Sequence, residues 1–329
     1  MSVRTEFDVR QEVLEAEARI RLHIRETPLE PSLWLSRAGS CEVYLKLENV
    51  QVTNSFKLRG ASNKLLSLTD EERQRGIVTA STGNHGSAVA YLLRRFGWQG
   101  SIFVPENASP AKIEALRLLG ADLRFHGTDG AETERFARRT AEETGRVYIS
   151  PYNDPKIIGG QGTIAVELEQ RLEGIDSVFV PVGGGGLVSG IAGYLKSADA
   201  QIEIIGCQPR RSAVMFESIK AGRVLDLESE PTLADGTAGG MDADTITYPV
   251  CRDRIDEFIL VEEEEIAAAI RLILERHHLL IEGAAALAVA SFLRVADRYK
   301  GRRVVLILTG SRISLEALRS VLAPGEQSG

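Results

Sequence analysis

The chain has 329 residues, of which 43% are hydrophobic and 26% charged, proportions typical of a soluble globular protein with a full core. Its formal net charge of −7 and pI near 5.5 argue against a protein built to bind nucleic acid or an anionic membrane surface. The three cysteines, Cys41, Cys207 and Cys251, lie far apart in the sequence, which excludes a disulfide framework and a C-x-x-C zinc site.

The predicted elements alternate between helices and short apolar strands. Apolar residues at helical spacing predict a first helix from Val9 to Ile20, where Asp8 and Gln11 resemble a capping box. A strand at Val43–Leu47 follows. The next predicted helices are Phe56–Leu66, Gly86–Arg95, Pro110–Leu119 and Gly130–Glu143, and the strands between and after them are Ile77–Ala80, Ser101–Val104, Asp122–His126 and Val147–Ser150.

The second half of the chain repeats this rhythm. Its predicted helices are Ile157–Arg171, Leu187–Lys196, Glu262–Arg276 and Ala284–Tyr299, and its strands are Val178–Val182, Ile202–Cys207, Glu257–Val261 and Val304–Leu308. Apolar strands that alternate with helices are typical of parallel sheets buried on both faces. We therefore expect an α/β fold with doubly wound, largely parallel sheets, and a disordered tail after Pro324.

Nothing in the sequence predicts export or a membrane span. Residues 1–21 are charged throughout and lack the apolar stretch of a signal peptide. The longest apolar run, around Ala284–Leu293, is about half the length that a bilayer requires. We expect a cytoplasmic protein with neither a membrane nor a nucleic-acid partner.

Four glycines follow one of the predicted strands. In open α/β sheets ligands bind beyond the carboxyl ends of strands, and Gly183–Gly186 lie at such a place and open a helix. Because a helix N-terminus favours anions, this pattern predicts a phosphate-binding loop, with a flexible turn as the plain alternative. A dinucleotide site is disfavoured, because the next strand ends at Gln208 without an acid and Glu203 lies at its other end.

Lys57 begins a predicted helix after a polar turn. A lysine that holds an aldehyde cofactor as a Schiff base needs a fixed position and a lowered pKa, which burial and a neighbouring cation such as Arg59 both promote. Most lysines are solvated surface groups, so Lys57 by itself is better explained as one of these.

Two further strand ends carry polar residues. The turn Ser81–Gly86 offers hydroxyls and backbone donors suited to a carboxylate, although on these residues alone an ordinary helix cap is the better explanation. Within this turn His85 is a candidate general base, with a packing role as the alternative. Thr309, at the end of the last strand, either hydrogen-bonds a ligand atom or only packs.

In this order and spacing, these segments resemble the fold-type II pyridoxal-phosphate enzymes, above all the serine and threonine dehydratases and serine racemase. The similarity covers nearly the whole chain. Further segments that fit are Glu26-Thr27-Pro28-Leu29, Lys46-Leu47-Glu48-Asn49, Gly160-Gln161-Gly162-Thr163, Ala234-Asp235-Gly236 and Leu280-Ile281-Glu282. The resemblance implies a fold like that of the tryptophan synthase β subunit. It places residues 1–75 and 150–329 in a large cofactor-binding domain and 76–149 in a small mobile domain, and it implies a homodimer.

The resemblance also assigns roles to individual residues. Lys57 is the expected cofactor lysine and the base at Cα, with Thr82 at the position of the second acid/base. The expected cofactor contacts are Phe56 on the pyridine ring, Asn84 at the 3-hydroxyl, Gly183, Gly184, Gly185, Gly186 and Leu187 at the phosphate, Thr309 at the pyridine nitrogen and Glu282 near the ring. The expected substrate carboxylate contacts are Ser81, Thr82, Gly83, Asn84 and His85.

Three differences from the family pattern bear on the substrate and on metal binding. Thr82 stands where serine racemase has a serine, and its branched side chain argues against racemisation. Gln208 and Val214 replace two carboxylates of a divalent-cation site, so no metal is expected there. The loop 236–241 and the strand end 309–312 also differ from the usual sequence of the family. At both places the chain resembles the dehydratases of hydroxyectoine utilisation.

The expected reaction is loss of water from a small β-hydroxy amino acid such as threonine or serine, giving a 2-keto acid and ammonia. Other substrates in this class are hydroxyectoine-derived compounds and threo-3-hydroxyaspartate, whose extra carboxylate could pair with Arg312 unless that residue is merely solvated. Serine racemase is a further alternative. Outside this class stand a non-catalytic pyridoxal-phosphate carrier and a nicotinamide oxidoreductase.

Overall fold

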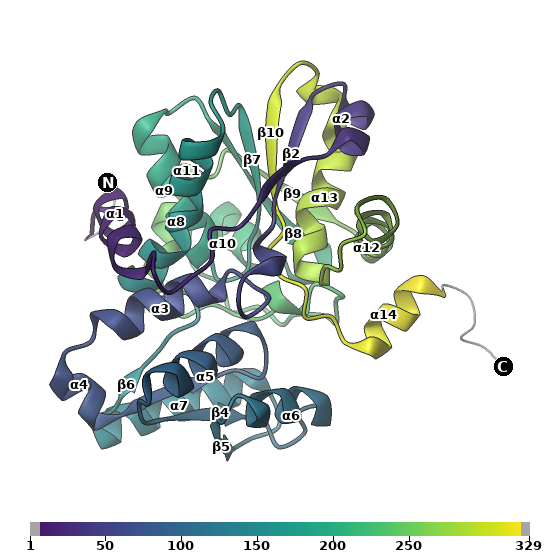
Figure 1. The fold of residues 1–329 in the computed structure, drawn as a ribbon. Coiled ribbons are helices and arrows are strands. Elements are labelled where there is room, and N and C mark those ends of the chain that lie inside the picture. Colours follow the sequence, from purple (N-terminus) through teal and green to yellow (C-terminus); the bar gives the residue numbers. More distant parts are fainter. Residues whose placement is uncertain (1–6, 324–329) are drawn as a thin grey trace.

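Two largely parallel β-sheets flanked by helices make up the protein (Figure 1). The structure, a computed structural model, describes residues 7–323, so the disorder predicted after Pro324 lies outside the described residues. Within the described part of the chain, no helix combines the length and apolar character needed to cross a bilayer.

The larger sheet has six strands in the order β1-β2-β10-β7-β8-β9. Its strands are β1 (Leu29–Pro31), β2 (Glu42–Lys46), β7 (Ser177–Pro181), β8 (Glu203–Pro209), β9 (Glu257–Val261) and β10 (Arg303–Ile307). The strand β1 pairs antiparallel with β2, and the other pairings are parallel. Because β10 lies between β2 and β7, the loops that follow these three strands meet at one edge of the sheet.

The helices and 3₁₀ turns of this part cover both faces of the six-stranded sheet. They are α1 (Val9–Ile20), α2 (Leu33–Gly39), η1 (Glu48–Val50), α8 (Pro155–Arg171), α9 (Gly186–Ala198), η2 (Arg210–Ser212), α10 (Val214–Ala221), η3 (Asp235–Thr237), α11 (Thr247–Arg254), α12 (Glu263–His277), α13 (Gly283–Val295), η4 (Ala296–Tyr299) and α14 (Leu315–Leu322).

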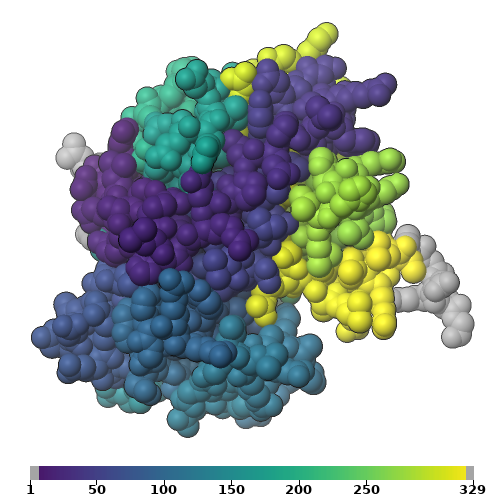
Figure 2. Space-filling view, in the orientation of Figure 1, coloured from purple at the N-terminus to yellow at the C-terminus, as the bar shows by residue number. Residues whose placement is uncertain are grey.

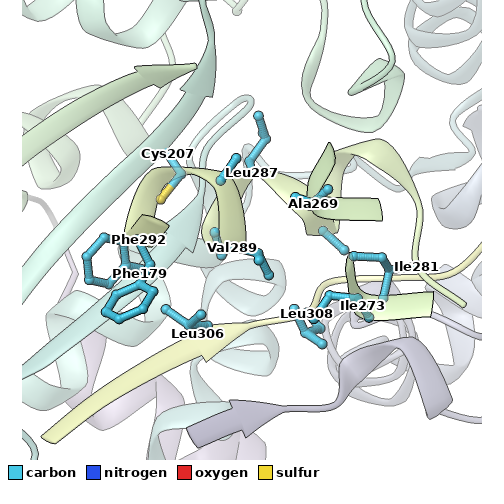
Figure 3. Close-up of a cluster of buried hydrophobic side chains, with 14 of the residues drawn as sticks. Phe179, Cys207, Ala269, Ile273, Ile281, Leu287, Val289, Phe292, Leu306 and Leu308 are labelled. Carbon is cyan, nitrogen blue, oxygen red and sulfur yellow. The ribbon is translucent and has the colours of Figure 1, made fainter. Parts of the chain in front are cut away.

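Side chains of the strands alternate between these two covered faces, as the pleat of a strand requires. Leu306 and Phe179 pack on the side of α13, where Figure 3 shows them near Phe292. Val305 and Ile307 face the other side and pack in a second cluster with residues of α1, α8 and α9. Burial on both faces explains why these strands are continuous apolar runs in the sequence.

The smaller sheet has four parallel strands in the order β5-β4-β3-β6. Its strands are β3 (Ile77–Ala80), β4 (Gly100–Val104), β5 (Asp122–Phe125) and β6 (Val147–Tyr148), and its helices are α5 (Asn84–Phe96), α6 (Pro110–Leu118) and α7 (Gly130–Thr144). In Figure 2 this part of the chain gathers, in blue, as a lobe below the rest of the molecule. Helix α3 (Lys57–Ser67) contacts α8 on one side and α5 on the other, and it continues through α4 (Asp70–Arg75) to β3.

The predicted α/β class with parallel sheets is confirmed, and several details differ. Helices α2, α4, α10, α11 and α14 were not predicted. The helix predicted from Ala284 to Tyr299 ends at Val295 and closes in the 3₁₀ turn η4. The predicted capping box is half formed, because Asp8 accepts from the Gln11 N–H at 3.2 Å while the Gln11 side chain donates to Glu15 instead.

Candidate active site

The turn before Lys57 is held by backbone hydrogen bonds to the segment after β10. The Phe56 N–H donates to the Thr309 carbonyl at 3.1 Å, and the Ser311 N–H donates to the Asn54 carbonyl at 3.1 Å. Asn54 itself has a φ of +62°, a left-handed conformation that asparagine tolerates better than most residues. Helix α3 therefore begins at a fixed place beside the end of β10.

The Lys57 amine lies in a partly buried position at the start of α3. Its Nζ donates to the Pro151 carbonyl at 2.8 Å. Burial disfavours the charged amine and lowers the pKa of Lys57 to about 8, although Glu134 and Glu282 act in the opposite direction. About half of the amine is therefore neutral near pH 8, which is the form that attacks an aldehyde.

The expected contribution of Arg59 to this lowered pKa is not found. The guanidinium of Arg59 is fully buried between the carboxylates of Glu48 and Glu167. These two acids neutralise its charge, so burial rather than a neighbouring cation shifts the pKa of Lys57. Proximity in the sequence was misleading because residues two apart in a helix point to different sides.

The four glycines after β7 form the tight loop that the sequence predicted. Gly185 has a φ of +86° and precedes α9, whose first-turn N–H groups have no partner within the helix. A Cβ on Gly184 would lie 2.6 Å from the Tyr152 ring, and a Cβ on Gly186 would lie 2.9 Å from the Tyr152 Cα. The loop backbone thus approaches Tyr152 more closely than any side chain would allow. Its amides and the α9 N-terminus suit an anionic group such as a phosphate.

Asn84 and Glu282 join the two sheets at the site. Asn84 begins α5, and its Nδ2 donates to both carboxylate oxygens of Glu282, at 2.8 and 3.0 Å. Glu282 precedes α13, and it also accepts from the Arg312 N–H at 3.0 Å. Burial raises the pKa of Glu282. A Cβ on Gly310 would lie 2.7 Å from this carboxylate, so the strand end fits closely around it.

Several buried polar atoms in this region have no hydrogen-bond partner among residues 7–323, and two of them belong to side chains expected at the cofactor. These two are the hydroxyl oxygen of Thr309 and the side-chain oxygen of Asn84, and Thr309 is only 2% exposed. Buried polar atoms are almost always paired in proteins, so atoms of this kind point to a ligand. Pyridoxal phosphate offers a ring nitrogen for Thr309, a ring hydroxyl for Asn84, an aldehyde for Lys57 and a phosphate for the glycine loop. The residues present fit this cofactor.

The polar side chains of the turn between β3 and α5 differ in burial and in their hydrogen-bond partners. Ser81 Oγ accepts from the Gly83 N–H at 3.1 Å, and Thr82 is partly exposed beside it. His85 is buried, with its Nε2 at 3.1 Å from the Ile149 carbonyl. Burial, together with the nearby Lys57, lowers the pKa of His85 to about 3, so this ring is neutral at physiological pH. The hydroxyls and the first amides of α5 are left as the groups that suit a carboxylate.

Tyr152 and Pro151 were not singled out from the sequence. Both lie just after β6, at the carboxyl end of a strand, and this position was the available signal. The Tyr152 hydroxyl accepts from the Asp242 N–H at 2.7 Å, which fixes the ring against the glycine loop. Pro151 contributes only its carbonyl, which no residue pattern could indicate.

The end of β8 does not form a dinucleotide site. Gln208 is buried, and its Oε1 accepts from the Phe216 N–H at 2.9 Å. Glu203 begins the strand and lies at the opposite end. Val214, the second position of the cation site in the family pattern, is buried and apolar. Across residues 7–323, no cluster of three or more His, Cys, Asp and Glu side chains suits a metal ion.

Comparisons with known proteins identify the family of the chain. The chain matches the family described as pyridoxal-phosphate dependent enzyme over residues 20–310. It is 39% identical over 315 residues to L-threonine ammonia-lyase of Thermotoga maritima, an overlap of 96% of this chain and 78% of the relative.

Solved structures show the same similarity. The processed form of threonine deaminase isoform 2 from Solanum lycopersicum has a TM-score of 0.91 at 34% identity, covering 95% of this chain and 87% of that one. Maize serine racemase has a TM-score of 0.88 at 32% identity, covering 95% and 96%. The predicted resemblance is thus confirmed, and the chain belongs to the pyridoxal-phosphate-dependent enzymes of fold-type II.

Proposed function

We propose that the protein is a pyridoxal-phosphate-dependent ammonia-lyase that removes water from a small β-hydroxy amino acid such as threonine or serine. The products are a 2-keto acid and ammonia. Relatives at 36–39% identity over more than nine tenths of this chain carry the names threonine ammonia-lyase and threonine dehydratase. The observation that carries the proposal is the Lys57 amine, with its pKa of about 8, in one site with the unpaired oxygens of Thr309 and Asn84.

Each group has a proposed task at a stated atom. Pyridoxal phosphate supplies the electron-withdrawing ring that makes the Cα proton of a bound amino acid removable. With the cofactor bound, Lys57 Nζ would hold its aldehyde carbon, and once the substrate amine replaces it there the freed amine would take the Cα proton. Thr309 Oγ would face the ring nitrogen, Asn84 the ring hydroxyl, and Phe56 the ring face. A threonine hydroxyl cannot keep the ring nitrogen protonated as an aspartate would, so prompt loss of the β-hydroxyl is favoured over transamination.

The remaining proposed contacts concern the cofactor phosphate and the substrate carboxylate. The backbone of the glycine loop and the first turn of α9 would hold the phosphate, and Glu282 would lie near the ring. The proposed cofactor contacts in these two places are Gly183, Gly184, Gly185, Gly186, Leu187 and Glu282. The substrate carboxylate is held by the turn before α5 through hydroxyl and N–H groups. The proposed contacts there are Ser81, Thr82, Gly83, Asn84 and His85.

Elimination is favoured over racemisation by Thr82. Racemisation needs a second acid/base on the far side of Cα from Lys57, where racemases use a serine. Thr82 is partly exposed, and its methyl group limits how closely the hydroxyl can approach a substrate carbon. A non-catalytic carrier is disfavoured because it would not need the polar turn that Thr82 belongs to.

A second substrate class is favoured by Arg312. This residue is half-buried next to Glu282 and has no ion pair among residues 7–323. Burial lowers the pKa of its guanidinium, which a substrate anion would offset. We include threo-3-hydroxyaspartate as a candidate substrate for this reason, and hydroxyectoine because of the differences in loop 236–241.

We further propose two domains, a dimer and a cytoplasmic location. Residues 76–149 enclose the four-stranded sheet and would move as a small domain against residues 1–75 and 150–329. Helix α14 extends from the body in Figure 1, and its Leu315 and Leu322 are 63% and 49% exposed, which suits contact with a second copy. The three cysteines are all free, as expected in a reducing compartment.

The deciding experiment compares Lys57→Ala with Lys64→Ala, which removes a lysine of the same helix paired to Asp154. We expect Lys57→Ala to lose both the yellow absorption of the bound cofactor and keto-acid release, while Lys64→Ala keeps both. The substrates are L-serine, L-threonine, threo-3-hydroxyaspartate and hydroxyectoine. Turnover by a Lys57→Ala protein would falsify the assignment, and a yellow parent protein inert to all four compounds would favour the carrier.

A further inference from the structure

Three sequence segments that resemble the family but have no role in the site meet Arg59 of α3 at one place. They contribute Thr27 before β1, Lys46 at the end of β2 with Glu48 in η1, and Thr163 in α8. The side chains of all five residues are buried. Segments scattered over more than 130 residues of sequence thus converge on a single cluster.

Arg59 is the centre of this cluster. Its Nε and Nη2 donate to the two carboxylate oxygens of Glu48, both at 2.8 Å. Its Nη1 and Nη2 donate to the two oxygens of Glu167 in α8, at 2.7 and 2.9 Å. Glu167 also accepts from Lys46, which donates to the Thr27 carbonyl at 2.7 Å. Arg59 is 0% exposed, so this pairing is fully shielded from water.

The charges of the cluster balance, because Lys46 and Arg59 face Glu48 and Glu167. The pKa of Arg59 is raised because Glu48 and Glu167 outweigh burial. The pKa of Glu167 falls to about 2 because Arg59 and Lys46 outweigh burial. Buried ion pairs are poor stabilisers, since apolar residues of similar volume often serve a core as well or better. Because removing four charged groups from water is costly, we infer that the cluster has a role other than stabilising the fold.

The cluster lies next to the turn that carries Lys57. Arg59 is two residues further along α3, whose first turn has no side-chain cap. In its place, Arg59 fastens this turn to Glu48 in η1 and to Glu167 in α8. Helices α3 and α8 are in close contact at this place. A Cβ on Gly160 of α8 would lie only 2.6 Å from the Gly60 Cα of α3.

We propose that the buried ionic cluster of Lys46, Glu48, Arg59 and Glu167 positions the Lys57 amine. The proposal rests on the proposed assignment of Lys57 as the cofactor lysine. Arg59 acts through the backbone of α3, which it fixes relative to α8. Helix α8 begins at Pro155, four residues after the Pro151 carbonyl that accepts from Lys57 Nζ. Rigid placement of both helices keeps the amine against this carbonyl and out of water.

The test is a charge-balanced double variant, Arg59→Met with Glu48→Gln, which leaves Lys46 and Glu167 paired with each other. The pH dependence of Lys57 acetylation is measured by mass spectrometry on the full-length, cofactor-free protein, together with its rate of recombination with pyridoxal phosphate. We expect the pKa of Lys57 to rise by about one unit, so that both rates at pH 8 fall about fivefold. Lys220, exposed on α10 away from this junction, is the internal reference and should not change.

The matched control is Glu12→Gln with Lys156→Met, which removes a less buried ion pair joining α1 to the same helix α8. It should leave Lys57 unchanged. If the first double variant does not fold, Arg59→Lys replaces it. Lysine keeps the positive charge but cannot donate hydrogen bonds to both carboxylates as the guanidinium does. A folded variant of either kind with an unchanged Lys57 profile overturns the proposal. Failure of the cofactor assignment is seen separately, as cofactor retained by Lys57→Ala.

Discussion

Alanine at Gly184 is expected to disturb the glycine loop without straining its backbone. Gly185 has a positive φ, whereas Gly184 does not, so alanine can adopt the conformation found there. The added methyl would nevertheless lie 2.6–2.7 Å from three carbons of the Tyr152 ring. Ordinary contact begins near 3.4 Å, so the ring must move by about 0.8 Å.

The size of the effect follows from what holds Tyr152 in place. Forcing extra volume into a packed contact costs about 1–3 kcal/mol. Displacement of the ring also weakens the bond from the Asp242 N–H to the Tyr152 hydroxyl, a further loss of about 1 kcal/mol. We therefore expect Gly184→Ala to lower the free energy of unfolding by about 2–4 kcal/mol. Because the loop amides shift with it, the dissociation constant for pyridoxal phosphate should rise at least tenfold.

Urea unfolding of the cofactor-free protein and calorimetric titration with the cofactor measure the two effects. The control is Gly130→Ala in α7, where a Cβ meets nothing within 4 Å and φ is not positive. It should leave cofactor binding unchanged and raise stability by about 0.4–1 kcal/mol. Adding Tyr152→Leu to Gly184→Ala should restore part of the loss. An unfolding free energy within 0.5 kcal/mol of the parent would refute the argument from the Tyr152 contact.

Two further predictions concern the amine and the unpaired hydroxyl. Because burial lowers the pKa of Lys57 to about 8, the rate of cofactor attachment, followed by absorbance, should rise tenfold per pH unit below 8 and level off above it. The unfolded chain holds this proton more tightly, so Lys57 should also make the cofactor-free protein more stable as pH rises from 8 towards 10.5, as urea unfolding would show. Thr309→Val removes an unpaired hydroxyl, so stability should stay within about 1 kcal/mol while cofactor affinity falls. In the control Ser62→Ala, which removes another unpaired buried hydroxyl, cofactor titration should show no change, and equal losses in both variants would contradict the role of Thr309.

Most strands could be predicted because burial on both faces leaves a clear signature. The runs Ile77–Ala80 and Glu257–Val261 are strands with the predicted bounds. The helices that were missed are short and lack such a signature. Helix α4 has no buried residue and forms through the capping box of Thr69 and Glu72, a signal present in the sequence. Helix α11 carries Pro249 in its first turn, where proline is tolerated although it usually marks a break.

The segments of the site could be predicted individually from the loops after strands. The hydrogen bonds and ion pairs between these segments could not. Asn84 and Glu282 are 198 residues apart, and no periodicity indicates that they share two hydrogen bonds. The lowered pKa of Lys57 was expected, and its cause was only half right. Burial lowers it, whereas Arg59 points into a cluster whose acids come from η1 and α8. Pairing between distant side chains depends on tertiary packing, which the local pattern does not contain.

The partner of Lys57 explains how an amine can be held in place and remain reactive. A carboxylate in contact with Nζ would favour the ammonium form and raise the pKa of Lys57. The structure offers the Pro151 carbonyl, which carries no net charge and accepts a hydrogen bond from the ammonium and from the neutral amine alike. Glu134 and Glu282 act on Lys57 through space, and burial still outweighs them. Position is therefore fixed by a group without net charge, and burial is the largest influence on which protonation state prevails.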